Sequence, residues 1–306
     1  MFHLCASTPE LPPRAELATL LAGTGGHPGN AGFNHDIDRG GLRGDDLEQL
    51  METRYRHLRI ERAGKVAHLI LNRPDILNAV HQAAAIEVEA AARALGADPE
   101  LRLIAIRGAG RAFCTGMDLK ALAAGHVDMR YFRIWEDALR CFETMDKLVL
   151  CLIHGHAIGG GLQLALACDI RVATTDASLA VPAIKEGLIP GLGTFRLARF
   201  IGLGRAKRMI LSGDSVTGAE ALEIGLVDHL VSAADMVPEF EALIENYMAV
   251  NSEGCRLSKQ ALRECFDLGY EAFLERYMEL QEQAFGSKDF AEAMTAYRAK
   301  RAPNWG

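Results

Sequence analysis

Residues 148–168 read LVLCLIHGHAIGGGLQLALAC, in which an apolar run leads into three consecutive glycines and then into a second apolar run. The first run, residues 148–153, is typical of a buried strand, and the second, residues 162–168, is typical of a helix. Glycine lets other groups come close to the backbone, and the first N–H groups of a helix have no acceptor inside it. The turn Gly159-Gly160-Gly161 therefore predicts a strand-to-helix junction with backbone amides that are free to bind a ligand.

A second glycine turn lies earlier in the chain, in Cys114-Thr115-Gly116-Met117-Asp118-Leu119. It also follows an apolar run and leads into a helix-like segment, which Asp118 is placed to cap. Two such turns can aim backbone N–H groups at one point and so form an anion hole. Donors arranged in this way stabilise an enolate or a tetrahedral oxyanion by about 2.7–4 kcal/mol each. The pair of turns therefore predicts chemistry on an ester or thioester carbonyl.

From Tyr55 onward, strand-like apolar runs alternate with helix-like segments. We expect strands at residues 66–71, 103–106, 148–153, 170–173 and 179–181, and helices at residues 80–95, 134–145 and 162–168. This alternation favours an α/β fold built from parallel βαβ units, with the site at the carboxyl ends of the strands. Beyond Ser212 the pattern becomes mostly helical, at residues 219–224, 238–248, 257–266, 270–285 and 290–300.

Composition divides the chain into three parts. Residues 1–54 are rich in proline and glycine and are predicted to be an N-terminal extension, flexible or loosely docked. Residues 55–250 form the predicted core, and residues 251–306 a helical C-terminal region. No internal repeat is present.

The overall charge and composition exclude some classes of partner. A net charge of −7 gives no basic footprint for nucleic acid. The seven cysteines are odd in number and lack CxxC spacing, which favours reduced thiols over a disulfide framework. No apolar stretch is long enough to span a membrane, and the N-terminus lacks the pattern of an export signal. These features predict a cytoplasmic protein without a nucleic-acid or membrane partner.

Six ordered motifs resemble those of the enoyl-CoA hydratase/isomerase (crotonase) superfamily over Tyr55 to Trp305. Ala112-Phe113-Cys114-Thr115-Gly116-Met117-Asp118-Leu119-Lys120 resembles its AFxxGxDLK segment, and residues 154–161, HGHAIGGG, resemble its NGxAxGGG segment. Four shorter segments also match, at residues 71–74 (LNRP), 167–171 (ACDIR), 187–191 (GLIPG) and 221–228 (ALEIGLVD).

The resemblance implies a crotonase-like ββα spiral core whose helical C-terminal region serves oligomerisation and CoA contact. It also implies a homotrimer or a dimer of trimers and an acyl-CoA substrate. No metal and no separate cofactor are expected, because coenzyme A is part of the substrate. Met117 and Gly160 match the positions whose backbone amides form the oxyanion hole. Lys120 and Lys300 match lysines that approach the nucleotide and the phosphates of CoA.

The chain departs from the family at the two acid–base positions. Hydratases of this family carry one glutamate just after the triple glycine and a second after a proline twenty residues later, and here these positions hold Gln163 and Ala183. An amide does not transfer protons usefully near neutral pH, and alanine has no titratable group, whereas general acid–base catalysis contributes roughly 10²–10⁴-fold. Gln163 can still orient a water or hold a substrate oxygen through its amide.

Other residues are candidates for the missing proton transfer. Glu186 lies three residues after Ala183, so on a helix its carboxylate faces a similar direction. His156 and His154 flank the triple glycine, and histidine titrates near operating pH. Tyr131 and His126 are expected to line the acyl pocket.

These features together predict a lyase or isomerase that stabilises a thioester enolate, with an unassigned proton-transfer group. Two alternatives remain. Residues 182–191 also resemble a cofactor-independent dioxygenase branch that oxidises an arylacetyl-CoA, in which an enolate reacts with O₂. The second alternative is a catalytically silent subunit that binds CoA esters, acts as a scaffold or binds RNA.

Overall fold

The computed structural model describes residues 55–305, which all belong to the second of the two units into which the chain divides, Arg43–Gly306. The predicted extension, residues 1–54, lies outside the described residues. The predicted boundary at residue 250 falls between helices α9 (Met236–Met248) and α10 (Ser252–Glu264). Both helices belong to the same unit, so the division of the core from the C-terminal region stays a prediction.

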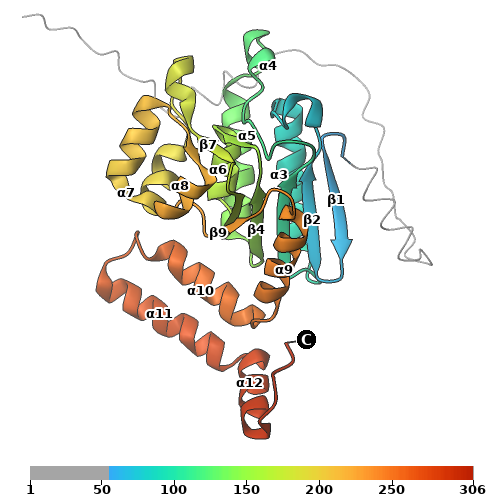
Figure 1. The fold of residues 1–306 in the computed structure, drawn as a ribbon. Helices are drawn as coiled ribbons and strands as arrows, with labels where there is room; N and C mark the ends of the chain where they lie inside the picture. The colour runs from blue at the N-terminus through green and yellow to red at the C-terminus, as the bar shows by residue number, and fades with distance from the viewer. Residues whose placement is uncertain (1–54, 306) are drawn as a thin grey trace, which may run out of the picture. The chain divides into compact units, whose positions relative to one another are not determined.

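The main sheet contains six strands in the order β1-β2-β3-β4-β6-β9 (Figure 1). The first strand pairs antiparallel with the second, and every later pair is parallel, as the alternating pattern predicts. The strands are β1 (Leu58–Ala63), β2 (Val66–Leu71), β3 (Leu103–Gly108), β4 (Leu148–Ile153), β6 (Ile170–Thr174) and β9 (His229–Val231).

A small second sheet contains the strand that leads into the triple glycine. It consists of β5 (His156–Ile158), β7 (Ser178–Ala180) and β8 (Val216–Thr217), in the order β5-β7-β8. Strand β5 directly follows β4 and leads into α6 (Gly160–Leu166). The triple glycine is therefore held between a strand of this small sheet and the start of a helix.

The main sheet is covered on both faces, and the two faces have separate hydrophobic clusters. Alternate residues of β4 supply them: Cys151 packs in the larger cluster, and Leu150 and Leu152 pack in the smaller one. Helices α3 (Gln82–Ala97) and α5 (Met129–Thr144) pack on each other and bury their apolar faces in the larger cluster. Phe240 and Ile244 of α9 cover the other face. Burial on both faces explains why β3 and β4 are continuous apolar runs.

The remaining helices complete the unit. They are α4 (Leu119–Ala123), α7 (Gly193–Ser212), α8 (Gly218–Glu223), α11 (Tyr270–Phe285), α12 (Lys288–Ala299) and the short 3-10 helices η1 (Pro74–Ile76) and η2 (Pro182–Glu186). Helices α10, α11 and α12 follow one another in the orange and red part of Figure 1. Asn251 and Ser287 cap α10 and α12 through hydrogen bonds to backbone N–H groups. The mixed α/β core with a helical C-terminal region agrees with the predicted fold class.

Within residues 55–305, no helix combines the length and the apolar composition needed to cross a bilayer. The cysteines of this part of the chain are all free thiols: Cys114, Cys141, Cys151, Cys168, Cys255 and Cys265.

Candidate active site at two glycine turns

The first glycine turn lies directly against the strand that leads into the second. Cys114 N–H donates to His156 O at 2.9 Å, and Ile158 N–H donates to Cys114 O at 2.9 Å. Gly116 has a φ of +79°, which favours glycine. A Cβ there would lie 2.7 Å from the backbone nitrogen of Gly160. The two turns are therefore in contact, at Gly116 and Gly160.

The second turn is tight enough to exclude side chains. Gly159 has a φ of +54°, and its N–H donates to Ala180 O at 2.8 Å in β7. A Cβ on Gly161 would collide with the carbonyl of Cys114. These two glycines fix the place where α6 begins.

In the first turn of α6, the N–H groups of Gly161 and Leu162 have no acceptor among the residues that the structure describes, and neither do the amides of Met117 and Gly160 at the contact itself. Asp118 N–H donates to Val80 O at 3.0 Å, and Gln163 N–H is the first in α6 with an acceptor, Gly159 O at 3.1 Å; the free amides at the contact are those of Met117 and Gly160. Both free amides belong to half-buried residues. Both amides are therefore left unused by the described part of the chain.

Asp118 caps the helix after the first turn, as predicted. Its side chain accepts a hydrogen bond from Ala121 N–H at 3.2 Å at the start of α4. The same carboxylate forms an ion pair with Arg73 at 3.3 Å. Asp118 is thus engaged in holding the turn.

Gln163 is buried in the first turns of α6, and its amide is oriented by one hydrogen bond. Gly193 N–H donates to its Oε1 at 3.0 Å. A backbone N–H can only donate, so the amide oxygen must face Gly193. The Nε2 group has no acceptor in the described part of the chain. Gln163 therefore has the N–H donors of Nε2 free for a ligand, while its oxygen accepts one hydrogen bond from Gly193.

Glu136 of α5 is a carboxylate near Gln163 that sequence reasoning missed. Both side chains approach Gly191, where a Cβ would lie 3.0 Å from Glu136 Oε1 and 3.2 Å from Gln163 Oε1. Glu136 accepts from Leu192 N–H at 3.0 Å and pairs with Arg196 at 2.7 Å. Arg196 also bonds Glu143. Glu136 thus holds the loop that orients Gln163. Its partners lie more than fifty residues away along the chain, so no local pattern reveals this role.

The other candidates for proton transfer lie in different surroundings. Glu186 ends η2 with an exposed side chain, and its carboxylate has no partner within residues 55–305. His156 is exposed on β5. His154 is buried, with Nε2 3.1 Å from Gly110 O, and burial lowers its pKa. That environment favours a neutral, structural imidazole.

The two lysines predicted to contact CoA lie far apart in the chain's structure. Lys120 is exposed on α4, at the upper edge of Figure 1, whereas Lys300 is exposed at the end of α12, at the lower edge. Within a single chain, Lys120 and Lys300 therefore do not lie side by side.

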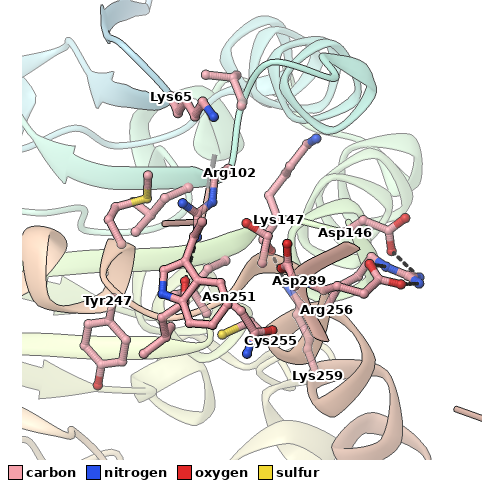
Figure 2. A pocket seen from close by; sticks show the side chains of 18 of the residues that line it. Lys65, Arg102, Asp146, Lys147, Tyr247, Asn251, Cys255, Arg256, Lys259 and Asp289 are labelled. Atoms are coloured by element: carbon pink, nitrogen blue, oxygen red, sulfur yellow. Dashed lines mark hydrogen bonds and ion pairs between the residues drawn. The ribbon is translucent and has the colours of Figure 1, made fainter. Parts of the chain in front are cut away.

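A separate cavity of about 390 Å³ lies near the amino ends of β3 and β4 and the start of α10 (Figure 2). Charged side chains line it, and several pair with each other or with neighbours: Arg256 with Glu253 at 2.6 Å, and Lys259 with Asp169 at 2.8 Å. None of the predicted site residues lines this cavity.

The fold and the glycine turns define a class of protein: an α/β protein with free backbone amides where two glycine turns meet. The family model "Enoyl-CoA hydratase/isomerase" matches residues 61–306. The chain therefore belongs to the enoyl-CoA hydratase/isomerase family.

Proteins similar to this chain are named as hydratases of enoyl-CoA or crotonyl-CoA. It is 32% identical over 259 residues to a crotonyl-CoA hydratase of Syntrophomonas wolfei, covering 82% of this chain and 98% of the relative. It is 34% identical over 260 residues to a probable enoyl-CoA hydratase, echA8, of Mycobacterium bovis, with the same coverage. The crystal structure of an enoyl-CoA hydratase from Bacillus anthracis is similar with a TM-score of 0.78 and 29% identity, over 82% of this chain and 99% of that one.

Proposed function

We propose that this protein transforms acyl-CoA thioesters by holding the thioester oxygen between the backbone N–H groups of Met117 and Gly160. The observation that carries the proposal is that these two amides, at the contact of the two glycine turns, have no acceptor within residues 55–305. Membership of the enoyl-CoA hydratase/isomerase family supports CoA thioesters as the substrate class.

In this mechanism, negative charge develops on the thioester oxygen as the acyl group becomes an enolate. The two amides are fixed before the reaction by their turns, so no reorganisation is needed when the charge appears. Gln163 donates from Nε2 to a water or to a substrate oxygen, because the bond from Gly193 N–H to Oε1 fixes the orientation of its amide.

The proposed reaction needs a group that transfers a proton to or from the acyl group. We keep Glu186 as the acid or base, because its carboxylate is free of hydrogen bonds and ion pairs within the described residues and it belongs to the same 3-10 helix as Ala183. His156 is the second candidate. Glu136 is a positioning residue, since both of its oxygens are bonded.

We further propose that the protein assembles as a trimer or a dimer of trimers. A groove of about 950 Å³ between α5, α7 and α10 is lined in part by the exposed apolar side chains of Phe195, Leu262 and Phe266. A second copy would cover these side chains. Assembly would also let Lys300 of one subunit approach CoA bound near Lys120 of another.

The exchange of both usual glutamates for Gln163 and Ala183 favours one second candidate, oxygenation. Once one base has taken the α-proton, the enolate held by the two amides can attack O₂ through its α-carbon: the electron pair of the enolate forms the new C–O bond and reduces O₂ to a peroxide. In that reaction carbon is oxidised, O₂ is reduced, and no metal is required.

A panel of CoA esters, followed by mass spectrometry with and without oxygen, tests the proposal. A product of equal mass indicates isomerisation, and a product heavier by one water indicates hydration. Oxygen uptake with an oxidised product selects the second candidate. Binding without any product would contradict both and indicate a silent CoA-ester-binding subunit.

A further inference from the structure

Three basic residues form a row at the amino ends of three neighbouring parallel strands. Lys65 directly precedes β2, Arg102 precedes β3 and Lys147 precedes β4. The backbone pairing sets them side by side, since Arg102 N–H donates to Lys65 O at 2.9 Å and Leu148 N–H donates to Arg102 O at 3.1 Å. Adjacent strands lie roughly 4.8 Å apart, so this edge of the sheet gathers positive charge.

The row borders the cavity of about 390 Å³ that lies apart from the glycine turns. Lys65, Arg102 and Lys147 all line it, and Figure 2 shows their side chains in one view with Asn251 and Cys255 at the start of α10. Small-molecule sites have volumes of roughly 300–1,000 Å³. The cavity is at the lower end of this range and therefore has the size for a compact ligand.

The carboxylates that line this cavity are engaged by other groups. Glu253 pairs with Arg256 at 2.6 Å, and Asp146 lies 3.9 Å from the same guanidinium. Asp289 accepts a hydrogen bond from the backbone N–H of Glu253 at 3.0 Å. These contacts leave the charge of the row uncompensated by the acidic side chains beside it.

Two cations of the row, Arg102 and Lys147, have no carboxylate partner among residues 55–305. The Arg102 guanidinium donates to Val250 O at 2.7 Å, and its Nε is buried without a partner in that part of the chain. The hydroxyl of Ser252, which also lines the cavity, is likewise buried and unpartnered there. Like charges in neighbouring positions repel, and a partly buried cation is stabilised by a counter-ion. This edge of the cavity therefore favours an anion.

Apolar side chains line the cavity beside these polar groups. Leu101, Met248 and Val250 are among them. Trp305 lines it too, and a hydrogen bond from its Nε1 to Ala249 O at 2.7 Å holds the indole in place. A ligand that fills the cavity thus combines an anionic group with a compact apolar body.

We propose that this cavity is a second ligand site, which binds a compact phosphate ester. The two cations without carboxylate partners match the nearly two negative charges that a phosphate monoester carries near neutral pH. A guanidinium also binds phosphate through paired N–H donors. Met117, Gly160 and Gln163 do not line the cavity. Binding here is therefore separate from the proposed reaction and does not depend on it.

Calorimetry with phenyl phosphate, inorganic phosphate and succinate at a pH of about 7.5 tests the proposal. Phenyl phosphate should bind about tenfold more tightly than the other two anions, because inorganic phosphate lacks the apolar body and succinate lacks the phosphate group. Arg102→Gln and Lys147→Gln each remove one cation of the row. Each should weaken phenyl phosphate binding by roughly tenfold or more, the loss of one charge-assisted hydrogen bond.

Lys207→Gln is the matched control, because Lys207 is exposed on α7 and does not line the cavity. It removes the same charge and should bind phenyl phosphate like the wild-type protein. Equal weakening in Lys207→Gln would overturn the site, since that result indicates attraction by the overall charge.

Fluorine NMR of the wild-type protein labelled with 5-fluorotryptophan places the ligand even if a variant folds poorly. The chain has two tryptophans, Trp305 at the cavity and Trp135 buried in α5. Phenyl phosphate should shift the Trp305 resonance and leave the Trp135 resonance in place. Excess coenzyme A, which is too large for the cavity, should not reverse the shift.

Several results would overturn the proposal. They are no binding of phenyl phosphate, an affinity unchanged in both Arg102→Gln and Lys147→Gln, a Trp305 resonance that does not move, or displacement by coenzyme A. Succinate bound as tightly as phenyl phosphate would overturn phosphate as the ligand class. Inorganic phosphate bound as tightly would overturn the role of the apolar wall.

Discussion

At the scale of single residues, Glu186 differs from Asp118 and Glu136 because nothing in the described chain engages its carboxylate. Asp118 caps a helix and pairs with Arg73, and Glu136 is bonded through both oxygens. Glu186 shares the 3-10 helix η2 with Ala183, and if it transfers the proton, Glu186→Gln should lower kcat by at least ~10²-fold with little change in binding. Steady-state kinetics with the best ester of the panel measures this. Lys185→Gln, its exposed neighbour, is the control and should keep normal turnover. A nearly unchanged kcat in Glu186→Gln would remove Glu186 from the mechanism.

The sequence predicted only part of the site at this scale. Motif spacing located Met117, Gly160 and Gln163 because their positions depend on local turns. It did not find Glu136 or Arg196, because their roles arise from contacts between α5 and segments that follow much later in the chain.

At the scale of elements, α7 depends on a glycine that breaks its helical geometry. Gly202 has φ +76° and ψ 156°, a conformation nearly restricted to glycine. Gly202→Ala should lower the free energy of unfolding by about 1–3 kcal/mol, although a Cβ there has open space around it. Gly204→Ala is the control in the same helix, since its backbone is helical and its Cβ also meets nothing within 4 Å. It should be neutral or stabilising by up to about 1 kcal/mol. Denaturant unfolding of both variants measures the difference between their free energies of unfolding. Equal effects of the two substitutions would contradict backbone strain at position 202.

The elements that could be predicted from the sequence are those with a clear hydrophobic period. Strand β4 and helix α11 occupy the predicted residues, because a buried strand and a long amphipathic helix have clear periodicities. Helix α7 was not predicted. Its two halves, joined at Gly202, have no common apolar face, so no single period runs through it. The short strands β8 and β9 were also missed, since two or three residues carry no period.

At the scale of the whole molecule, assembly is expected to depend on the apolar groove between α7 and α10. Native mass spectrometry should show three or six copies of the chain. Leu262→Glu places a charge in the groove and should shift the protein toward smaller species. Leu211→Glu is the matched control, because Leu211 is equally exposed, at 69%, but does not line the groove. A monomeric wild-type protein, or a Leu262→Glu variant that assembles normally, would contradict the proposal that copies of the chain assemble through this groove.

The central claim is that the Met117 and Gly160 amides polarise one thioester oxygen, and vibrational spectroscopy tests it most directly. Difference infrared spectra of a bound CoA ester carrying a ¹³C-labelled carbonyl report the strength of that C=O bond. We predict a clear downshift of the carbonyl band in the wild-type protein. Gly160→Pro, which deletes one amide at the first helical position, where proline is tolerated, should reverse much of that shift. A band at the frequency of the free ester in the wild-type complex, or an identical shift in a folded Gly160→Pro complex, would contradict the account.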